Sequence, residues 1–551
     1  TPTRHHSSAA SFVYKRQEFK HPYPDDLKQL FEQETGKYLD WFFDDLIFTT
    51  KKIDYSIKKV KREKEKIGDK SYDEVTLKQK PQNHLKGPFS LSALKDGEVV
   101  KTIWYDGFLG EMPVLFPTMD YDELKIDVAE VIPDVNRANN SYKMNKLMHK
   151  KMPLRLQPFG SIENYNRKQV FFMPVLGYNV YDKTMLGMAF YNSLLPVRKF
   201  DYIVMPMYAF GSKTLSGMVN AGYNWYPKGK TFQHIRLSMT ASTYGNGYYD
   251  VYGNTPENRD LISRDVVKFY RFMPKLDIVL KEENQRSKVE RRFTIRHVNV
   301  KKDRYECPEG NVYRCTSTVA DDYYVNEIAF SQKNKRRINP YSMIIKAQQG
   351  TDFSQISFEG NYKLSYAGGG SNHGFDIRFF AGGFLQNETI NENPANVKFL
   401  STNDLPRWDY MLDDVAFGRY EVEGFASHQL GMRNGGFKLP SSIGTSDRFL
   451  LAANFKSSFL PRLPLKLYGD IGMAITENEL FFPWSGNVLF DAGVALVVIP
   501  NTFEIYLPLF HSTDFRTSFK ANDTKFYEKI SFYINFNTLN PIRQAREASL
   551  F

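Results

Sequence analysis

Short alternating segments dominate the C-terminal two-thirds of this 551-residue chain. From Leu215 to Trp225, every second residue is apolar or small, and Ser216, Asn220 and Asn224 lie between them. Because successive side chains of a β-strand point to opposite faces, such a segment has one apolar and one polar face. About sixteen such segments follow one another, and no second apolar layer remains to cover them. The pattern favours a closed barrel with lipid outside and a polar lumen inside.

The composition is compatible with a membrane barrel. Charged residues make up 25% of the chain, and its mean hydropathy is −0.46. No apolar run reaches the roughly 18–20 residues of a membrane helix, but a barrel needs only alternate residues to face lipid. The 15% of aromatic residues suit the interface girdles of such barrels. Aromatic-rich sandwiches have a similar composition, so an extracellular all-β protein remains the alternative.

The predicted strands have polar faces that carry many charges. A wet lumen accepts such charges and a dry core does not. They either select a solute or satisfy one another across a plugged barrel. The polar candidates for the lumen are Arg236, Glu359, Lys363, Lys466 and Asp470, and the residues of the final strand expected to face lipid are Ile530, Phe532, Ile534 and Phe536. We expect strands near 169–178, 183–193, 200–210, 214–226, 231–243, 264–282, 286–301, 321–333, 339–349, 353–365, 374–388, 445–459, 463–475, 486–499, 502–510 and 526–538.

The lengths of the connections give an independent test of the barrel. The long ones are expected at 244–263, 302–320, 389–444, 476–485 and 511–525. All of them follow odd-numbered strands, and connections after odd-numbered strands lie outside if the first strand starts from the periplasm. Short periplasmic turns and long outer loops are the rule for outer-membrane barrels. This parity predicts a barrel whose two ends, and the domains before it, lie in the periplasm.

The residues before the barrel change character several times. Pro24 and the acidic residues after it predict a helix start, and Gly36 is expected to separate two helical pieces. A dense basic run spans residues 51–66 and is expected to be a solvated linker or helix surface, with anionic lipid or an acidic partner as the other possibility. Residues 66–145 alternate like a small β-sandwich, with a hairpin turn at 95–98. A polar connector spans 146–168.

The net charge of +11 and the two cysteines limit the partners and the compartment. No recognition motif accompanies the basic run, so nucleic acid is not expected. Cys307 and Cys315 close a small polar loop, which predicts a disulfide and an oxidising compartment. The N-terminus has no apolar signal region. Either an export signal has been removed, or the chain begins part-way through a larger protein.

The sequence shows no catalytic motif. None of the ten histidines is followed by glutamate, so no His-Glu-x-x-His zinc motif exists. Asp321-Asp322 and Asp413-Asp414 are expected in outer loops, where solvated acids are more common than calcium sites. We therefore expect no catalytic residue, metal site or cofactor within these residues.

Short motifs in the N-terminal part resemble the end of an M1-family (gluzincin) zinc aminopeptidase. They are residues 19–26 (Phe-Lys-His-Pro-Tyr-Pro-Asp-Asp), residues 31–43 with Gly36-Lys-Tyr-Leu-Asp-Trp-Phe, and residues 126–140, which end in Asp-Val-Asn-Arg-Ala-Asn-Asn. The resemblance covers roughly residues 16–145, and the last motif is similar to Bacteroidetes versions that continue into a membrane barrel. It implies that the zinc ligands and the general base lie upstream of the matched region. No residue of this chain inherits those roles, so zinc is expected only if an upstream peptidase domain exists.

Together, these patterns predict a membrane all-β protein with an antiparallel outer-membrane barrel of about sixteen strands. The expected parts are a helical segment with a basic linker (1–65), a small periplasmic β-sandwich (66–145), a connector (146–168), the barrel (169–540) and a tail (541–551). The expected role is to anchor an M1 metallopeptidase-like module at the outer membrane. The alternatives are a non-catalytic subunit of an outer-membrane assembly complex and a solute channel. The expected partners are outer-membrane lipid and other outer-membrane proteins.

Overall fold

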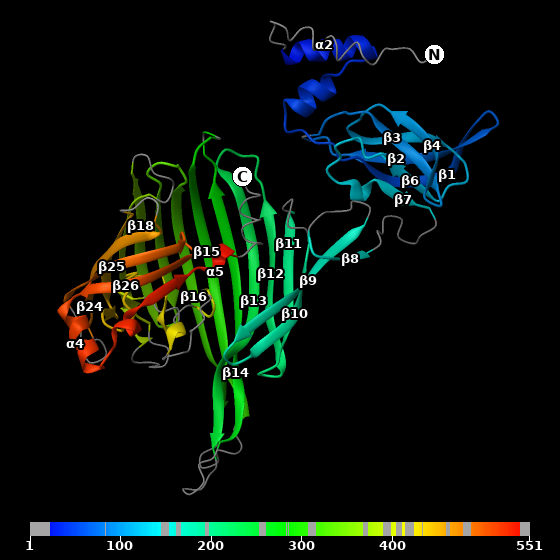
Figure 1. Cartoon of the computed structure of the whole chain (residues 1–551). Helices are drawn as coiled ribbons and strands as arrows, with labels where there is room; N and C mark the ends of the chain where they lie inside the picture. The colour runs from blue at the N-terminus through cyan, green and yellow to red at the C-terminus, as the bar shows by residue number, and fades with distance from the viewer. Residues whose placement is uncertain are drawn as a thin grey trace. The chain divides into compact units, whose positions relative to one another are not determined.

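The computed structural model describes residues 23–82, 84–144, 154–160, 167–192, 198–252, 261–282, 284, 286–306, 316–366, 373–389, 398–403, 410–413, 424–431, 433–458, 463–477 and 486–539. The chain divides into two compact units. The first contains residues 1–156 and 163–169, and the second contains residues 157–162 and 170–551. Figure 1 shows both, and each is described by itself.

The first unit begins with two helical pieces separated by a glycine. α2 (Pro24–Thr35) has proline and two acidic residues in its first turn, where they suit the positive end of the helix dipole. It ends at Gly36, whose φ of 65° is a left-handed conformation that favours glycine. The π-helix η1 (Trp41–Ile47) follows. The expected break at Gly36 is confirmed.

Two small sheets form the rest of the first unit. Their strand orders are β1-β2-β5 and β4-β3-β6-β7. One hydrophobic core lies between them and includes Ile57, Leu77, Phe89, Leu91 and Phe116. The strands are β1 (Ser56–Ile67), β2 (Lys70–Gln79), β3 (Phe89–Lys95), β4 (Glu98–Tyr105), β5 (Gly110–Pro117), β6 (Glu123–Ile126) and β7 (Ser141–Lys143), and the short helix η2 (Arg137–Asn139) precedes β7.

The structure places a strand where the sequence predicted a basic linker. β1 carries much of the lysine-rich run and lies at the edge of its sheet. Lys58 pairs with Glu111 at 2.7 Å, and Lys61 pairs with Glu74 at 3.0 Å. Lysine and glutamate are poor strand formers, which concealed the strand. At a sheet edge, however, charged side chains prevent pairing with other chains.

We call the two small sheets and their common core the β-domain. Two buried polar side chains in it have hydrogen-bond partners. Asp73 is buried and accepts hydrogen bonds from a backbone N–H at 2.8 Å and from the hydroxyls of Thr118 and Tyr121. Tyr55 is also buried, and its hydroxyl donates to the carbonyl of Gly87 at 2.7 Å. Burial raises the pKa of Tyr55 to about 12, because a low-dielectric environment disfavours the charged phenolate.

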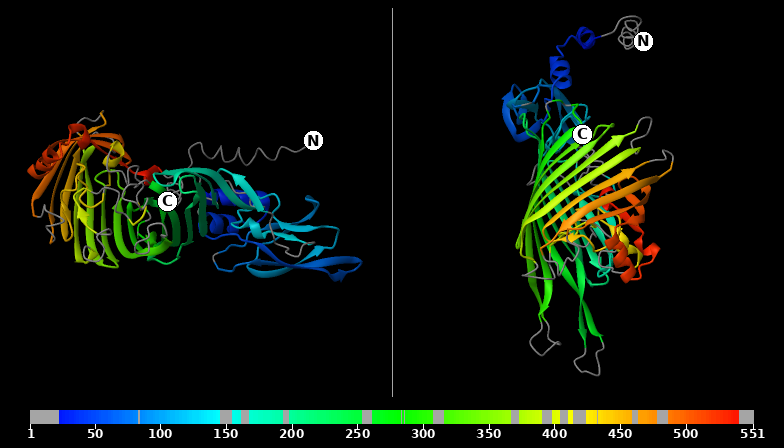
Figure 2. Two further views of the ribbon diagram at one scale, coloured as in Figure 1. Left: turned by 90° about the horizontal axis from the view of Figure 1, so that it is seen from below. Right: turned by 90° about the vertical axis from the view of Figure 1, so that its left-hand side faces the viewer.

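The second unit is built on one large, mostly antiparallel sheet of 18 strands. Figure 1 shows its long strands side by side, and Figure 2 shows the sheet curling round an interior. Its strands are β8 (Leu154–Pro158), β9 (Lys168–Asn179), β10 (Lys183–Tyr191), β11 (Phe200–Ala209), β12 (Thr214–Trp225), β13 (Phe232–Tyr252), β14 (Leu261–Leu280), β15 (Val289–Glu306), β16 (Thr316–Asn334), β17 (Tyr341–Gly350), β18 (Phe353–Ser365), β19 (Gly374–Asn387), β21 (Gln429–Leu430), β23 (Phe449–Ser457), β24 (Leu465–Ile475), β25 (Val488–Ile499), β26 (Phe503–His511) and β27 (Ser531–Ile534).

The neighbour order of these strands runs round a ring. It proceeds from β9 and β10 through β19, β23 and β27 and returns by way of β8. Paired residues among the described parts connect every neighbour from β9–β10 to β26–β27, but none connect β27 to β8. The ring is therefore not closed by a continuous sheet. The expectation of a closed barrel is met only in the curvature and order of the strands.

Each strand expected from the sequence overlaps one strand of the sheet, from β9 to β19 and from β23 to β27. The structure adds β8 and the two-residue β21 to this set. It also corrects two connections. The expected loops 244–263 and 302–320 are shortened because β13 and β14, and β15 and β16, continue as long hairpins. The extension of β13 carries Gly245 and Gly247, and the added residues of all four strands lack the alternation that marks the rest.

The two faces of the sheet differ as the alternation predicts. On β13, Arg236 and Ser238 face the interior, whereas Leu237 and Met239, which alternate with them, are 51% and 47% exposed. Similar outward apolar residues on other strands are Ile356, Leu467, Ile471 and Phe490. Contiguous exposed apolar surface on this scale is unusual for a protein that is surrounded by water.

The final strand and the segments around it have their own arrangement. β27 pairs with β26 on one edge and with the short parallel strand β21 on another. Of the expected lipid-facing residues, Phe532 is buried and its ring is stacked on the exposed Phe425, with centroids 4.7 Å apart. Ile530, Ile534 and Phe536 are half-buried. Contact of these residues with lipid remains a prediction. The nearby helices are η4 (Phe425–His428), α4 (Thr513–Ala521), η5 (Phe526–Lys529) and α5 (Phe536–Leu539), and a small separate sheet joins β20 (Leu400–Ser401) to β22 (Thr445–Ser446).

Two further observations complete the fold. Among the described residues, no helix has both the length and the apolar character needed to cross a membrane. Cys307 and Cys315 lie outside the described residues, so their disulfide remains a prediction.

Candidate functional site in the charged interior

The interior face of the large sheet carries a network of ion pairs. Each lumen candidate from the sequence has a charged partner there: Arg236 with Asp201, Glu359 with Arg378, Lys363 and Lys466 with Asp376, and Asp470 with Lys438. Two of the carboxylates, Asp201 and Asp470, are almost fully buried. The network is therefore a set of mutual contacts rather than a row of free charges along a wall.

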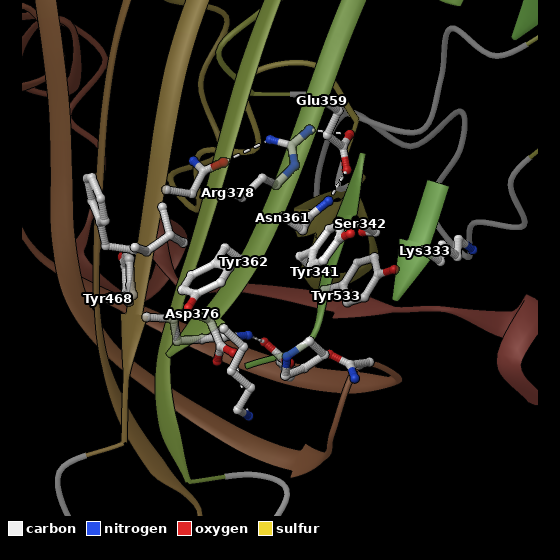
Figure 3. Close-up of a pocket in the computed structure, with 18 of the residues that line it drawn as sticks. Lys333, Tyr341, Ser342, Glu359, Asn361, Tyr362, Asp376, Arg378, Tyr468 and Tyr533 are labelled. Atoms are coloured by element: carbon white, nitrogen blue, oxygen red, sulfur yellow. Dashed lines mark hydrogen bonds and ion pairs between the residues drawn. The ribbon is translucent and has the colours of Figure 1, made fainter. Parts of the chain in front are cut away.

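One chain of contacts crosses several strands of the large sheet, whose strands form the wall around the interior. It ends at a segment that is not part of this wall. Arg378 donates to Glu359 at 2.9 Å and to the side-chain oxygen of Asn454 at 2.8 Å, as Figure 3 shows in part. Asn454 donates to Asp470 at 2.9 Å. The Lys438 ammonium lies 3.2 Å from Asp470. Because Lys438 belongs to the connection between β19 and β23, the chain of contacts ties this connection to the wall.

We call the described parts of this connection, 398–403, 410–413, 424–431 and 433–447, the inner segment. A second polar contact holds it to other strands. Asp413 accepts from Arg296 at 2.6 Å and also from Arg271. Arg296 in turn makes a two-pronged contact with Glu327, in which both N···O distances are 2.9 Å. The sequence placed Asp413 in an outer loop as a solvated acid, and the structure corrects this. The side chain is only 10% exposed, because the segment folds back onto the interior face.

Apolar contacts also hold the inner segment in place. Phe437, Leu439 and Ile443 are buried in one cluster with Leu489 of β25 and Phe515 of α4. Ala452 of β23 and Phe519 of α4 complete the cluster. Each buried side chain of this size contributes roughly 1.5–3 kcal/mol by leaving water. The inner segment is therefore packed as a core, in addition to being ion-paired.

The connections between strands distinguish the two ends of the sheet. We call the end with the tight connections 335–340 and 500–502 the turn end, and the opposite end, where the long hairpins project, the loop end. Near the turn end, Asp376 lies 2.9 Å from the Lys466 ammonium and 3.5 Å from that of Lys363. Glu504 lies 2.6 Å from Lys456 and also accepts from the hydroxyl of Tyr506.

A cavity of about 740 Å³ lies between these contacts. Its lining runs from Lys335, Pro340 and Asn501 at the turn end to Lys438 of the inner segment. Figure 3 shows the polar side chains that surround it. This volume is in the range of small-molecule sites, roughly 300–1,000 Å³. Lys438 brings the inner segment into this lining.

The groups in this interior are suited to binding a ligand. Within the described ranges, no group of three or more histidine, cysteine or acidic side chains is arranged to hold a metal ion. Asp321 and Asp322 fall in β16, but their side chains lie outside the description, as does Asp414. The interior offers fixed charges, amides and hydroxyls instead.

Sequence reasoning found the wall charges but missed the inner segment. Asp413 and its partner Arg271 are 142 residues apart, and Ser531 donates its hydroxyl to the carbonyl of Lys438 over 93 residues. Nothing in the 389–444 connection alternates like a strand, so only its unusual length marked it. A long connection within a compact unit is in itself a signal of function.

Comparisons with known proteins give no family. No family model matches the chain, and no curated protein matches it. Neither search therefore supports the resemblance of residues 16–145 to an M1 peptidase.

Solved structures give distant matches. The chain is similar to CdiB from Acinetobacter baumannii at 10% identity and a TM-score of 0.30, over 64% of this chain and 60% of that one. It is similar to BamA from Haemophilus ducreyi at 11% identity and a TM-score of 0.32, over 62% and 69%. It is similar to the P pilus usher PapC translocation pore at 10% identity and a TM-score of 0.15, over 73% and 76%. The chain spans 60% of the length of CdiB, and all three TM-scores are too low to carry an argument.

Proposed function

We propose that this chain is a β-barrel of the bacterial outer membrane whose interior is filled by its own inner segment. In this proposal it serves as a fixed anchor within an outer-membrane protein assembly rather than as an open solute channel. The β-domain of the first unit is the module that it holds at the membrane. The turn end suits the periplasmic side, because the longest connections lie at the loop end and such barrels carry their long loops outside.

The position of the inner segment is the observation that supports this proposal most strongly. Asp413 and Lys438 hold it to different strands of the wall, and Phe437 packs it against β25 and α4. A channel needs a continuous polar path, whereas this interior is crossed by buried ion pairs and an apolar cluster. The exposed apolar residues of the outward face support the membrane part of the proposal, because lipid is the solvent that such a surface fits.

The resemblance to the M1 family suggests a finer hypothesis for the anchored module. A peptidase-like domain would precede residue 16, and its zinc would polarise a carbonyl and activate water there. The intact mass of the native protein tests this hypothesis. A mass well above the 64.0 kDa of this chain supports an upstream domain, and an equal mass rules it out.

Spin labels on neighbouring residues of β13 test the barrel in lipid. Leu237→Cys and Ser238→Cys, each in a chain with Cys307 and Cys315 replaced by serine, are labelled and reconstituted into liposomes. We expect dissolved oxygen to relax the label at 237 strongly and the label at 238 weakly, because oxygen concentrates in lipid tails. Equal oxygen accessibility at the two positions would contradict a membrane-embedded outward face.

A further inference from the structure

The cavity at the turn end has more cationic than anionic side chains in its lining. Lys333, Lys335, Lys363, Arg378, Lys438 and Lys456 line it, together with only three acids, Glu359, Asp376 and Glu504. Each of these acids already has a basic partner. Lys335 and Lys438 pair with acids outside the lining, so the cationic excess rests on Lys333 and Lys363. A cleft in which one sign of charge prevails concentrates ions of the opposite sign. The cavity therefore favours an anion.

Lys363 is a lining cation that can turn toward a ligand without leaving an acid unpaired. Its ammonium lies 3.5 Å from Asp376, whereas Lys466 approaches the same carboxylate to 2.9 Å. Asp376 consequently keeps a close partner if Lys363 turns toward a ligand. Lys456, in contrast, is needed by the buried Glu504. The Lys363 side chain is 17% exposed, so it is accessible from the cavity.

Neutral polar groups lie in the same wall. Ser342 faces the cavity from β17, and Asn361 faces it from β18 two residues before Lys363. Asn361 donates to Glu359 at 2.9 Å, which fixes the orientation of the amide. Figure 3 shows both residues beside Glu359. A hydroxyl and an oriented amide suit ligand hydroxyls, which both donate and accept hydrogen bonds.

We propose that this cavity is a binding site for a small hydroxylated anion, such as a sugar phosphate or a sugar acid. The phosphate or carboxylate lies near Lys363, and the ligand hydroxyls lie toward Ser342 and Asn361. The inner segment closes the far side of the cavity, so the ligand enters and leaves from the turn end. The proposal goes beyond the proposed function, which requires only that the interior be filled.

Isothermal titration calorimetry of the full chain in detergent tests this site. The probes are glucose 6-phosphate, glucuronate, inorganic phosphate and glucose. We expect saturable binding of the two sugar anions, with weaker binding of phosphate and none of glucose. Lys363→Gln should weaken the binding of glucose 6-phosphate at least tenfold, and Lys333→Gln should weaken it to a smaller extent. Lys230→Gln removes the same charge from an exposed position outside the cavity lining and should leave the affinity unchanged.

Three results would overturn the proposal. The first is the absence of saturable binding to either sugar anion, and the second is equal affinity for inorganic phosphate and glucose 6-phosphate. The third is unchanged binding in a Lys363→Gln variant that is shown to be folded by the heat-dependent gel migration typical of membrane barrels. That last control matters because the variant leaves Asp376 paired with Lys466 and should fold. The proposed function is tested separately by spin labelling and conductance, so either idea can fail without the other.

Discussion

Substitution of Asp413 by asparagine should loosen the inner segment from the wall. Asp413 accepts hydrogen bonds from Arg271 and Arg296, and both arginines are largely buried. Arg296 keeps its two-pronged contact with Glu327 in the variant. Among the described residues, Asp413 is the carboxylate that pairs with Arg271, so Arg271 loses its counter-charge in the variant. The variant therefore leaves one buried guanidinium without a counter-charge.

The size of this effect follows from the geometry. Hydrogen bonds to charged groups contribute roughly 1.5–3 kcal/mol each, and removal of one partner from a buried ion pair costs about 3–5 kcal/mol. Asparagine keeps one acceptor oxygen, so the lower end of the second range applies. We therefore expect the contact to weaken by about 3 kcal/mol, which corresponds to a change on the order of 100-fold in the ratio of displaced to docked segment.

Planar-bilayer recording measures this ratio directly, because displacement of the segment opens a path through the barrel. The purified wild-type chain should show few or no conductance steps. Asp413→Asn should show brief openings with an open probability on the order of 100-fold higher. Raised salt should increase the openings of the wild-type chain, because ions screen the remaining contacts.

Asp277→Asn is the matched control. Asp277 is also buried on the interior face, where it pairs with Lys275 and accepts from Thr294 of the wall. The same neutralisation therefore leaves the contacts of the inner segment intact. If both variants open equally often, a general loss of stability explains the openings. If Asp413→Asn is as silent as the wild type, Asp413 does not hold the segment.

Three further predictions concern other parts of the chain. Burial raises the pKa of Tyr55 to about 12 from its ordinary value of 10.0, so its contribution to stability is intact below pH 10 and is lost as the pH rises toward 12. At about 1.36 kcal/mol per pKa unit, this is about 2–3 kcal/mol. Tyr55→Phe should therefore reduce the alkaline fall in thermal melts, and a fall as large as that of the wild-type chain would contradict this role of Tyr55. Asp73→Asn should destabilise the β-domain by about 2–4 kcal/mol, seen as an earlier urea transition, and an unchanged midpoint would show that its three hydrogen bonds contribute little. Peptide mapping under oxidising conditions should recover Cys307 joined to Cys315, and free thiols at both positions would refute the disulfide.

The wall of the large sheet was the part most accessible to sequence reasoning. On β13, the pattern from Ile235 to Ser242 alternates residue by residue, and the paired register follows it. The alternation of apolar and polar residues is lost where both faces of a strand meet the same kind of environment. The projecting part of the hairpin near Gly245 and Gly247 is such a place, since it extends past the region where one face needs to be apolar.

The interior site was less accessible, for a different reason. Glu359 and Arg378 lie on adjacent strands, and their contact follows from the register. Asp413 and Lys438 lie in a segment without periodicity, and their partners are fixed only when the whole sheet has formed. Charge complementarity in the sequence does not identify which of many acids and bases meet.

The contact between the inner segment and β27 has a consequence for the order of folding. β27 is the last strand of the sheet along the chain, and it pairs with residues 429–430 of the inner segment as well as with β26. One of the two surfaces on which β27 docks therefore exists only after the segment has entered the interior. Long-range contacts of this kind form late and slowly. Filling the interior and completing the wall become one cooperative step, so an assembly factor that delays β27 would keep the interior accessible.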